Sequence, residues 1–364
     1  MALQKEIKRS LSNNFGRENF DEHRFGRMPE RSVTAKQLLL SAKRVVKKAI
    51  GRDYIQPLIA GYTKYEKDLE LLYNSTNAES RDLLVKIIAY RILGYSKVKL
   101  PFNNEQYWRS LELVKTLKEG NETYDPHFMH FILDKFNLVG IGYDIKFFFS
   151  EIGVAIDFIA EQYAYKVNGK AVVEATDGDI VLDVGGCWGD TALYFATKVG
   201  ESGKVYSFEF IPDNIKLHNI NTALNPKINK RIEVIPNPVS EVSGTSVYFL
   251  DRGPGSNIQF TPFEGQTGSA ETISIDDFVE KYNVPRVDYI KMDIEGAESG
   301  ALKGAEKTIK KFKPKLAIAT YHSMEDFAGI PTWILNLNVG YELFIGHYTI
   351  HAEETVCFAK TNLK

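Results

Sequence analysis

The sequence predicts an α/β protein built on a mostly parallel β-sheet, with a helical region ahead of the sheet. Three observations lead to this fold class. From Ala171 onward, short β-rich runs alternate with helical runs. The first of these strands runs directly into a glycine-rich turn, and acidic residues stand at the ends of several strands. Strands that alternate with helices are typical of a parallel sheet covered on both faces, which binds its ligands beyond the carboxyl ends of its strands.

The composition indicates an ordinary globular protein. The chain has 364 residues, of which 44% are hydrophobic and 25% charged, so it is long enough for two domains. Its two cysteines, Cys187 and Cys357, are far apart in the sequence, which excludes a disulfide framework and favours a reducing compartment. No run approaches the roughly 18 apolar residues of a membrane span, and the first residues lack the apolar core of a secretory signal. We therefore expect a cytoplasmic protein.

The charge is unevenly distributed along the chain. Residues 1–50 hold 12 Lys and Arg against 5 Asp and Glu, a balance of +7, so the remaining 33 bases and 42 acids give −9. A basic arm can bind an anionic partner such as membrane lipid, nucleic acid or a phosphorylated carrier. The commoner explanation is a solvated helix face or a frayed terminus. We therefore assign no firm nucleic-acid partner, and peripheral membrane contact through this segment stays open.

Residues 1–150 are predicted to form a helical N-terminal region, followed by a second domain over residues 151–364. Residues 1–31 are polar and unperiodic and are expected to be loose. Beyond them, apolar residues recur at helical spacing. The expected helices are Val33–Ile50, Tyr65–Tyr73, Arg81–Leu93 and Asn104–Leu117. The aromatic stretch Phe131–Phe158 either packs or lines a pocket, and packing is the commoner role.

The second domain is predicted to contain seven strands with helices between them. The expected strands are Ile180–Val184, Lys204–Phe208, Ile232–Pro236, Tyr289–Met292, Leu316–Thr320, Tyr341–His347 and Thr355–Ala359. Helices are expected over Thr191–Lys198, Asp213–Leu224 and Ala297–Phe312.

The glycine turn has the spacing Asp183-x-Gly185-Gly186-x-x-Gly189 and so departs from the G-x-G-x-x-G of dinucleotide-binding turns. A carboxylate at Asp183 would repel a pyrophosphate but attract the ammonium of an amino-acid-bearing cofactor. About 20 residues on, the second strand ends at Glu209, which suits the ribose hydroxyls of NAD and of S-adenosylmethionine (SAM) alike. The turn therefore favours SAM over NAD, and a turn that serves packing alone is the remaining alternative.

A second group of polar residues follows the fourth and fifth strands. Asp293 and Glu295 lie two apart, so both face the same way in extended chain. Glu298 follows near the start of a predicted helix. Its negative charge could stabilise the positive end of the helix dipole, and this explanation is as good as a functional one. Tyr321 and His322 stand at the neighbouring strand end, and His322 can take a proton near neutral pH, although most lone histidines are structural.

These motifs resemble the FkbM family of SAM-dependent methyltransferases. The resemblance rests on the glycine turn, on Phe208-Glu209, on "SIDDF" at Ser274–Phe278, on "GPGSNIQF" with Ser256, and most of all on "IKMDIEGAE" at Ile290–Glu298. It covers the chain from about Ile152 onward, and residues 81–101 resemble, less specifically, an N-terminal extension of some longer members.

The resemblance implies a class I methyltransferase fold with a seven-stranded, mostly parallel sheet and one antiparallel strand near the C-terminal edge. It implies SAM as cofactor, S-adenosylhomocysteine as product, and a hydroxyl acceptor on a sugar, polysaccharide or natural product. The expected cofactor-binding residues are Asp183, Gly185, Gly186, Gly189, Glu209, Phe210 and Asn237, with Asn237 near the adenine. Trp188 and Phe210 depart from the family, which often has a small residue or proline there.

Methyl transfer from a sulfonium is an in-line displacement, and a hydroxyl needs a base before it can attack. The hypothesis assigns that base to Asp293 or His322 and places Glu295 in the same catalytic set. Glu298, Ser256 and Tyr321 are the expected acceptor-binding residues. The carboxylates could hold Mg²⁺, but we favour no metal and assign no metal ligands.

Three other functions stay open at this point. A nicotinamide-dependent oxidoreductase would need the missing G-x-G-x-x-G turn. A non-catalytic SAM-fold binding or scaffold protein would not need the acids at Asp183, Glu209 and Asp293. A nucleic-acid methyltransferase is supported only by the basic first 50 residues, and no Asn-Pro-Pro-Tyr stretch stands at the fourth strand. The N-terminal region is expected to serve acceptor recognition or the contacts of a symmetric homodimer.

Overall fold

The computed structural model describes residues 2–22, 26–28, 55–128, 131–251, 253 and 255–361, and these fall into two compact units. Unit 1 comprises the described part of residues 1–104 together with residues 349–353, and unit 2 comprises the rest. The division at Asn104 differs from the predicted boundary at residue 150. The helix predicted over Val33–Ile50 lies outside the described residues.

Unit 1 is helical, as predicted. Its elements are α1 (Ala2–Ser10), η1 (Gly16–Asn19), α4 (Gln56–Ile59), η2 (Ala60–Tyr65), α5 (Glu66–Ser75) and α6 (Ala78–Leu93). The Asn77 side chain accepts a hydrogen bond from the Ser80 amide at 2.8 Å and caps the start of α6. The expectation that residues 1–31 are loose is wrong for α1, because Ile7 is fully buried where α1 packs against α6.

Unit 2 begins with a helix and a small antiparallel sheet. Helix α7 (Glu105–Lys115) confirms one prediction, but β1 (Lys118–Tyr124), β2 (Leu133–Asn137) and β3 (Lys146–Phe149) lie where the helical region was expected to continue. The predicted helical region up to residue 150 is therefore wrong here. Strand β1 reads KEGNETY and buries no side chain, so it carries no apolar alternation that could signal a strand.

The large sheet of unit 2 has the seven strands that the sequence predicts. They are β6 (Ile180–Val184), β7 (Lys204–Phe208), β8 (Ile232–Ile235), β12 (Tyr289–Met292), β13 (Lys315–Ala319), β14 (Tyr341–His347) and β15 (Thr355–Thr361). Their order is β14-β15-β13-β12-β6-β7-β8, with β15 antiparallel to both of its neighbours. The sheet thus has one antiparallel strand next to its C-terminal edge strand, which confirms the predicted topology.

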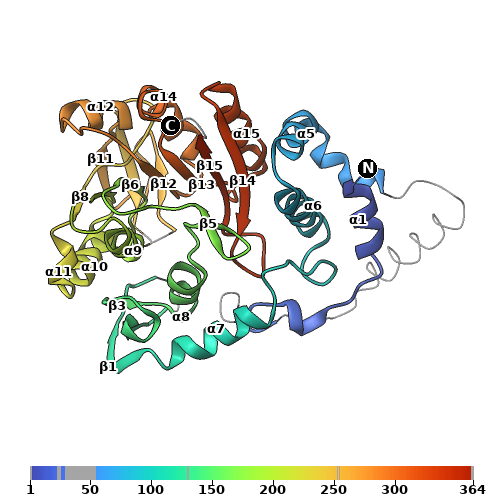
Figure 1. Ribbon diagram of the computed structural model, residues 1–364, viewed down its shortest axis with the longest axis horizontal. Helices are drawn as coiled ribbons and strands as arrows, with labels where there is room; N and C mark the ends of the chain where they lie inside the picture. The colour runs from blue at the N-terminus through green and yellow to red at the C-terminus, as the bar shows by residue number, and fades with distance from the viewer. Residues whose placement is uncertain are drawn as a thin grey trace, which may run out of the picture. The chain divides into compact units, whose positions relative to one another are not determined.

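Helices cover this sheet, and short strands fill the connections. The helices are η3 (Leu138–Ile141), α8 (Glu151–Val154), η4 (Ala155–Ala160, a π-helix), α9 (Asp190–Lys198), α10 (Pro212–Ala223), α11 (Pro226–Asn229), α12 (Ile275–Lys281), α13 (Glu298–Lys303), α14 (Glu306–Phe312) and α15 (Met324–Asn336). The short strands are β4 (Tyr165–Val167), β5 (Lys170–Val173), β9 (Ser246–Leu250), β10 (Asn257–Gln259) and β11 (Gly268–Glu271). Figure 1 shows α15 alongside β14 and β15, and α12 beside α14.

The helix predicted over Ala297–Phe312 is two helices, α13 and α14, which meet at Gly304. A Cβ at Gly304 would lie 2.3 Å from the carbonyl oxygen of Ser240, so the backbone at this junction packs closely against Ser240 and has no room for a larger residue. The two-helix arrangement leaves Glu298 in the first turn of α13.

Strand β12 lies in the middle of the sheet and is buried along its whole length. Tyr289, Ile290 and Met292 are fully buried, as expected for a parallel strand covered on both faces. Lys291 is buried in the same strand, which is unusual for a charged residue. Among the described residues, no helix is long and apolar enough to cross a membrane.

Candidate active site

The glycine turn follows β6 and packs directly against the end of β12. Gly185 has φ +89°, and a Cβ there would lie 1.9 Å from the carbonyl oxygen of Asp293. The amides of Gly185 and Gly186 both donate to the carbonyl of Phe208, at 3.1 and 2.9 Å, which ties the turn to β7. The turn therefore needs glycine for close backbone approach, and it places the expected cofactor site against the acids after β12.

Asp183 and Lys291 form a buried ion pair beneath this turn. Asp183 is fully buried and accepts hydrogen bonds from the hydroxyls of Thr191 at 2.9 Å and Ser207 at 3.0 Å. The Lys291 Nζ lies 3.3 Å from Asp183 Oδ1 and donates to the Gly185 carbonyl at 2.5 Å. Burial lowers the pKa of Lys291, but Asp183 and other nearby carboxylates outweigh it and the net shift is upward.

The ion pair contacts the glycine turn through Lys291, which donates to the carbonyl of Gly185. The oxygens of Asp183 are engaged by Thr191, Ser207 and Lys291, and its role as a direct cofactor contact stays a prediction. Sequence reasoning quoted Lys291 in the family motif but gave it no role. The available signal was a charged residue inside an otherwise apolar strand.

Glu209 follows β7 and is held by the chain around it. Its Oε1 accepts from the amides of Phe210 at 2.7 Å and Ile211 at 2.8 Å, and its Oε2 accepts from Asn214 Nδ2 at 3.2 Å. Burial raises the pKa of Glu209 to about 7, although these hydrogen bonds act in the opposite direction. Asn214 also accepts from the indole N–H of Trp188 at 3.1 Å, so the bulky Trp188 is anchored to the same residue that positions Glu209.

Two more buried carboxyl groups flank the turn. Asp190 follows Gly189 directly at the start of α9, and Asp157 lies on the π-helix η4. Burial, together with a hydrogen bond and repulsion between the two groups, raises the pKa of Asp157 well above its ordinary value. Burial also raises the pKa of Asp190, to about 6. Sequence reasoning missed this pair, because neither residue falls within a strand-end motif.

Two of the nine described non-glycine residues with positive φ belong to the candidate site. Cys187, in the glycine turn, has φ +42°, and Glu295, after β12, has φ +56°. Non-glycine residues in this left-handed region cost on the order of 1–3 kcal/mol and cluster at functional sites. Strain at Cys187 and Glu295 is compatible with a functional site, although seven other described residues share this backbone conformation.

Asp293 stands at the carboxyl end of β12 and is held by two phenols. Tyr163 donates to Asp293 Oδ2 at 3.2 Å, and Tyr321 donates to both carboxylate oxygens, at 3.1 and 3.2 Å. The Asp293 side chain stays 16% exposed, so it is not sealed off from solvent. Tyr321 was predicted in this site; Tyr163 was missed, because nothing in its sequence neighbourhood points to it.

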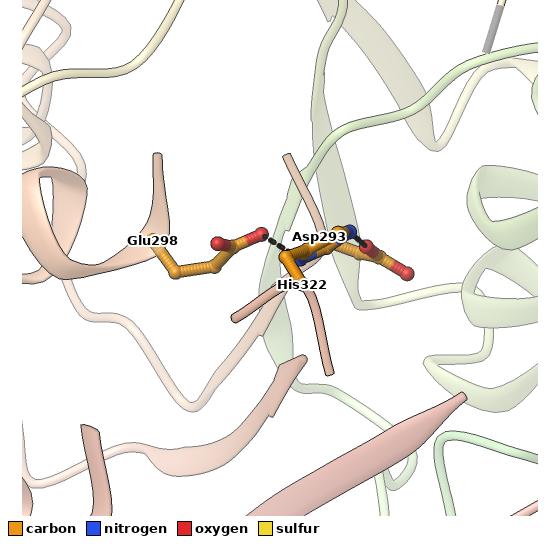
Figure 2. Close-up of side chains that lie close together, drawn as sticks. All are labelled: Asp293, Glu298 and His322. Atoms are coloured by element: carbon orange, nitrogen blue, oxygen red, sulfur yellow. Dashed lines mark ion pairs between the residues drawn. The ribbon is translucent and has the colours of Figure 1, made fainter. Parts of the chain in front are cut away.

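His322 brings the remaining acids of this group together. Its Nδ1 lies 3.2 Å from Glu298 Oε1, and its Nε2 lies 3.5 Å from both Asp293 Oδ1 and Glu295 Oε2. Figure 2 shows the imidazole between Glu298 and Asp293, with an ion pair on each side. The structure thus brings together Asp293, Glu295, Glu298, Tyr321 and His322, which the sequence placed after two neighbouring strands.

The charged groups in this cluster shift one another's pKa values. Burial lowers the pKa of His322, but the three surrounding carboxylates outweigh it and raise the pKa to about 9. Burial and the neighbouring Asp293 raise the pKa of Glu295 to about 7. Burial also raises the pKa of Asp293. Glu298 is fully buried, and its Oε1 accepts from the amide of Ile294 at 2.7 Å, so its contacts are with the loop before α13 and with His322 and not with the first turn of the helix.

Three predicted residues lie in other surroundings. Asn237, after β8, donates to the carbonyl of Glu271 at 2.9 Å, and the Phe210 ring packs edge-on against Phe249 at 5.5 Å. Ser256 donates to the carbonyl of Gly253 at 2.6 Å. Their roles in binding cofactor or acceptor stay predictions.

One group of the described residues could hold a metal ion. Ligand atoms of Asp293, Glu298 and His322 all lie within 4.8 Å of one another. The Nε2 of His322 and the Oε2 of Glu298 are buried without a hydrogen-bond partner.

Comparison with known proteins gives a family match and a set of structural likenesses. Residues 173–343 match the family model described as the methyltransferase FkbM domain. Comparison with curated proteins gives no match.

Among solved structures, the chain is similar to a methyltransferase FkbM from Methylobacillus flagellatus KT, with a TM-score of 0.52 and 17% identity over 82% of this chain. The match spans 60% of that protein's length. At this identity the likeness concerns the fold, and it agrees with the predicted class I methyltransferase architecture.

Two weaker likenesses have TM-scores too low to support an argument. Aeropyrum pernix fibrillarin in complex with SAM has a TM-score of 0.33 and 14% identity, over 66% of this chain and all of the other. A SAM-dependent O-methyltransferase from Thermotoga maritima has a TM-score of 0.32 and 15% identity, over 53% of this chain and 62% of the other.

Proposed function

We propose, on the premise that residues 173–343 are a methyltransferase FkbM domain, that this chain transfers the methyl group of SAM to a hydroxyl group of a sugar or another small molecule. The observation that carries the proposal is the contact between the glycine turn and the end of β12. There the backbone of Gly185 touches the Asp293 carbonyl, so a cofactor on the turn and an acceptor at Asp293 would meet at one edge of the sheet.

The residues around the turn fit SAM by their chemistry. SAM carries an ammonium and a sulfonium, and the turn is flanked by the carboxyl groups of Asp157 and Asp190. Glu209, at the end of β7, offers a carboxylate to the ribose hydroxyls. Gly185, Gly186 and Gly189 keep the turn packed against Asp293, Ser207 and His218, which fixes the position of its backbone. When bound, SAM supplies an electrophilic methyl group.

We assign the proton transfer to Asp293 and not to His322. Both ring nitrogens of His322 face carboxylates, so neither is directed at an acceptor. Asp293 is partly exposed, and the phenols of Tyr163 and Tyr321 fix its orientation. In this scheme Asp293 takes the proton of the acceptor hydroxyl as the oxygen attacks, while Glu295, which is half exposed, holds a neighbouring hydroxyl.

The first test is binding. We expect calorimetric titration of the purified chain to show binding of S-adenosylhomocysteine and none of NAD⁺, and we expect Glu209→Ala to weaken the binding. Binding of NAD⁺ alone would contradict the proposal. Binding of neither would favour a scaffold protein.

The second test is chemistry. Asp293→Asn should keep the affinity for S-adenosylhomocysteine but lose the transfer of radiolabelled methyl groups to a panel of glycan and small-molecule hydroxyl acceptors. Wild-type turnover in this variant would rule out the assigned role. Methyl transfer to RNA or DNA, with a salt-sensitive affinity, would replace the hydroxyl acceptor with a nucleic acid.

A further inference from the structure

We propose that Asp293 and His322 bind a divalent transition-metal ion at the carboxyl end of β12, with Glu295 as a third ligand and Glu298 orienting the imidazole. The ion would bind to Nε2 of His322, on the side of Asp293 and Glu295. The site lies beside the proposed acceptor position, so a catalytic use of the ion rests on the proposed function, whereas its binding does not.

The first argument is unsatisfied polar atoms. His322 is only 10% exposed and Glu298 is fully buried, yet Nε2 of His322 and Oε2 of Glu298 have no hydrogen-bond partner. Buried polar groups in native proteins are normally paired, and a bound ion is one of the standard explanations for an exception.

The second argument is charge. Three carboxylates, Asp293, Glu295 and Glu298, surround the single imidazole of His322. The nearby Lys291 already lies against Asp183 and the Gly185 carbonyl, deeper in the sheet. The excess of negative charge in a largely buried group attracts a cation, because clustered carboxylates repel one another when nothing compensates them.

The third argument is distance. The Nε2 of His322 lies 3.5 Å from Asp293 Oδ1 and 3.5 Å from Glu295 Oε2, which is too long for direct hydrogen bonds. Ligand atoms that share an ion at about 2.0–2.2 Å lie at most about 4.4 Å apart. Glu295 lies outside the group whose ligand atoms are all within 4.8 Å of one another, but its side chain is 54% exposed and so can turn toward the ion.

Glu298 completes the arrangement from the other side of the ring. Metal-binding histidines commonly donate their second N–H to a carboxylate, which fixes the ring orientation. Glu298 Oε1 lies 3.2 Å from Nδ1 of His322, and the Ile294 amide holds the same oxygen in place at 2.7 Å. Figure 2 shows this line of Glu298, His322 and Asp293.

The donor set indicates which ion would bind. Imidazole suits Zn²⁺ and other transition metals, whereas carboxylates suit Mg²⁺, Ca²⁺ and Mn²⁺. A site with one imidazole and two carboxylates therefore favours Mn²⁺ or Zn²⁺ over Mg²⁺. Binding through Asp293 Oδ1 keeps Oδ2 off the ion, where it accepts from the phenols of Tyr163 and Tyr321, each at 3.2 Å.

The test is metal binding by the full chain, without SAM or acceptor. The protein is stripped with a chelator, desalted and titrated with Mn²⁺ while electron paramagnetic resonance follows the free ion, and Zn²⁺ and Mg²⁺ then compete. We expect one Mn²⁺ per chain, displaced by Zn²⁺ far more readily than by Mg²⁺. His322→Gln and Asp293→Asn should each weaken binding at least tenfold, and Glu298→Gln about 10- to 100-fold.

His127→Gln is the matched control, because His127 is an exposed histidine beside Asp125 and outside this group. It should bind Mn²⁺ as the wild type does. No stoichiometric binding of Mn²⁺ or Zn²⁺, or binding that His322→Gln and Glu298→Gln leave unchanged, would overturn the proposal. Titration of the same samples with S-adenosylhomocysteine checks folding and separates the two proposals, since cofactor binding without metal binding refutes only the metal site.

Discussion

The buried ion pair beneath the glycine turn yields the most direct prediction about stability. Replacing Lys291 with methionine removes the positive charge and keeps most of the side-chain volume. It leaves Asp183 fully buried, with two hydroxyl donors but no opposite charge in contact. For charges 3.3 Å apart, Coulomb's law at an effective dielectric constant of about 20 gives an attraction of about 5 kcal/mol.

Because Asp183 keeps the hydrogen bonds from Thr191 and Ser207, we expect Lys291→Met to lower the free energy of unfolding by about 3–5 kcal/mol, the range for breaking a buried pair. The assay is urea unfolding followed by tryptophan fluorescence and circular dichroism, with a check that the slope m is unchanged. The Lys291 contact with the Gly185 carbonyl is lost as well, so the affinity for S-adenosylhomocysteine should also fall.

Two variants serve as controls for this experiment. Asp183→Asn combined with Lys291→Met removes both charges and should recover part of the lost stability, which a double-mutant cycle measures as coupling. Lys303→Met breaks an exposed pair with Glu241 and should cost less than about 1 kcal/mol. A Lys291→Met variant that unfolds at the wild-type urea midpoint would refute the reasoning.

Three further predictions concern the same edge of the sheet. The pKa of Glu209 is about 7, so its carboxyl group ionises between pH 6 and 8, and S-adenosylhomocysteine should bind about fivefold more tightly at pH 8 than at pH 6. The control variant Glu209→Gln should bind S-adenosylhomocysteine equally at both pH values. If this variant kept the pH dependence, the prediction would be contradicted. His218 is fully buried, and burial lowers its pKa to about 4, so the unfolded chain takes up its proton near pH 6.5 and the folded chain only near pH 4. Its contribution to stability is complete above about pH 7 and falls by about 3 kcal/mol toward pH 4, a loss that His218→Asn should reduce in urea titrations across this range. A Cβ at Gly186 would lie 2.0 Å from Ser207 Oγ, so Gly186→Ala should lower the free energy of unfolding by about 1–3 kcal/mol. Adding Ser207→Ala should restore part of this stability. An unchanged midpoint of thermal unfolding in Gly186→Ala would show that the turn can relax.

The main sheet was predictable because each of its strands is a short apolar run. Strands such as Ile180–Val184 and Tyr289–Met292 are buried on both faces, and a strand that is buried on both faces consists mostly of apolar residues. Strand β1, by contrast, is exposed and holds few apolar residues, so its strand conformation depends on pairing with β2, which no local pattern reports.

The positions of the site residues followed from the sheet, but their contacts did not. Parallel strands bring their carboxyl ends to one edge, so the meeting of Asp293 with His322 could be expected from the strand ends alone. The phenol of Tyr163 comes from 130 residues away in the sequence, and the Lys291 pair with Asp183 depends on two strands lying in register. Such contacts are set by tertiary packing and have no signature in a single stretch of sequence.

The central place of β12 has a consequence for the order in which the protein can fold. The strands β6, β7 and β8 are made first during synthesis, and they pair in that order, but the other side of β6 has no partner until Tyr289–Met292 have been made. Until then β6 is an open edge with an apolar surface, which invites pairing with other chains. A chain interrupted before Tyr289 is therefore expected to aggregate, and the two halves of the candidate active site are brought together only in this late step, when β12 enters the sheet.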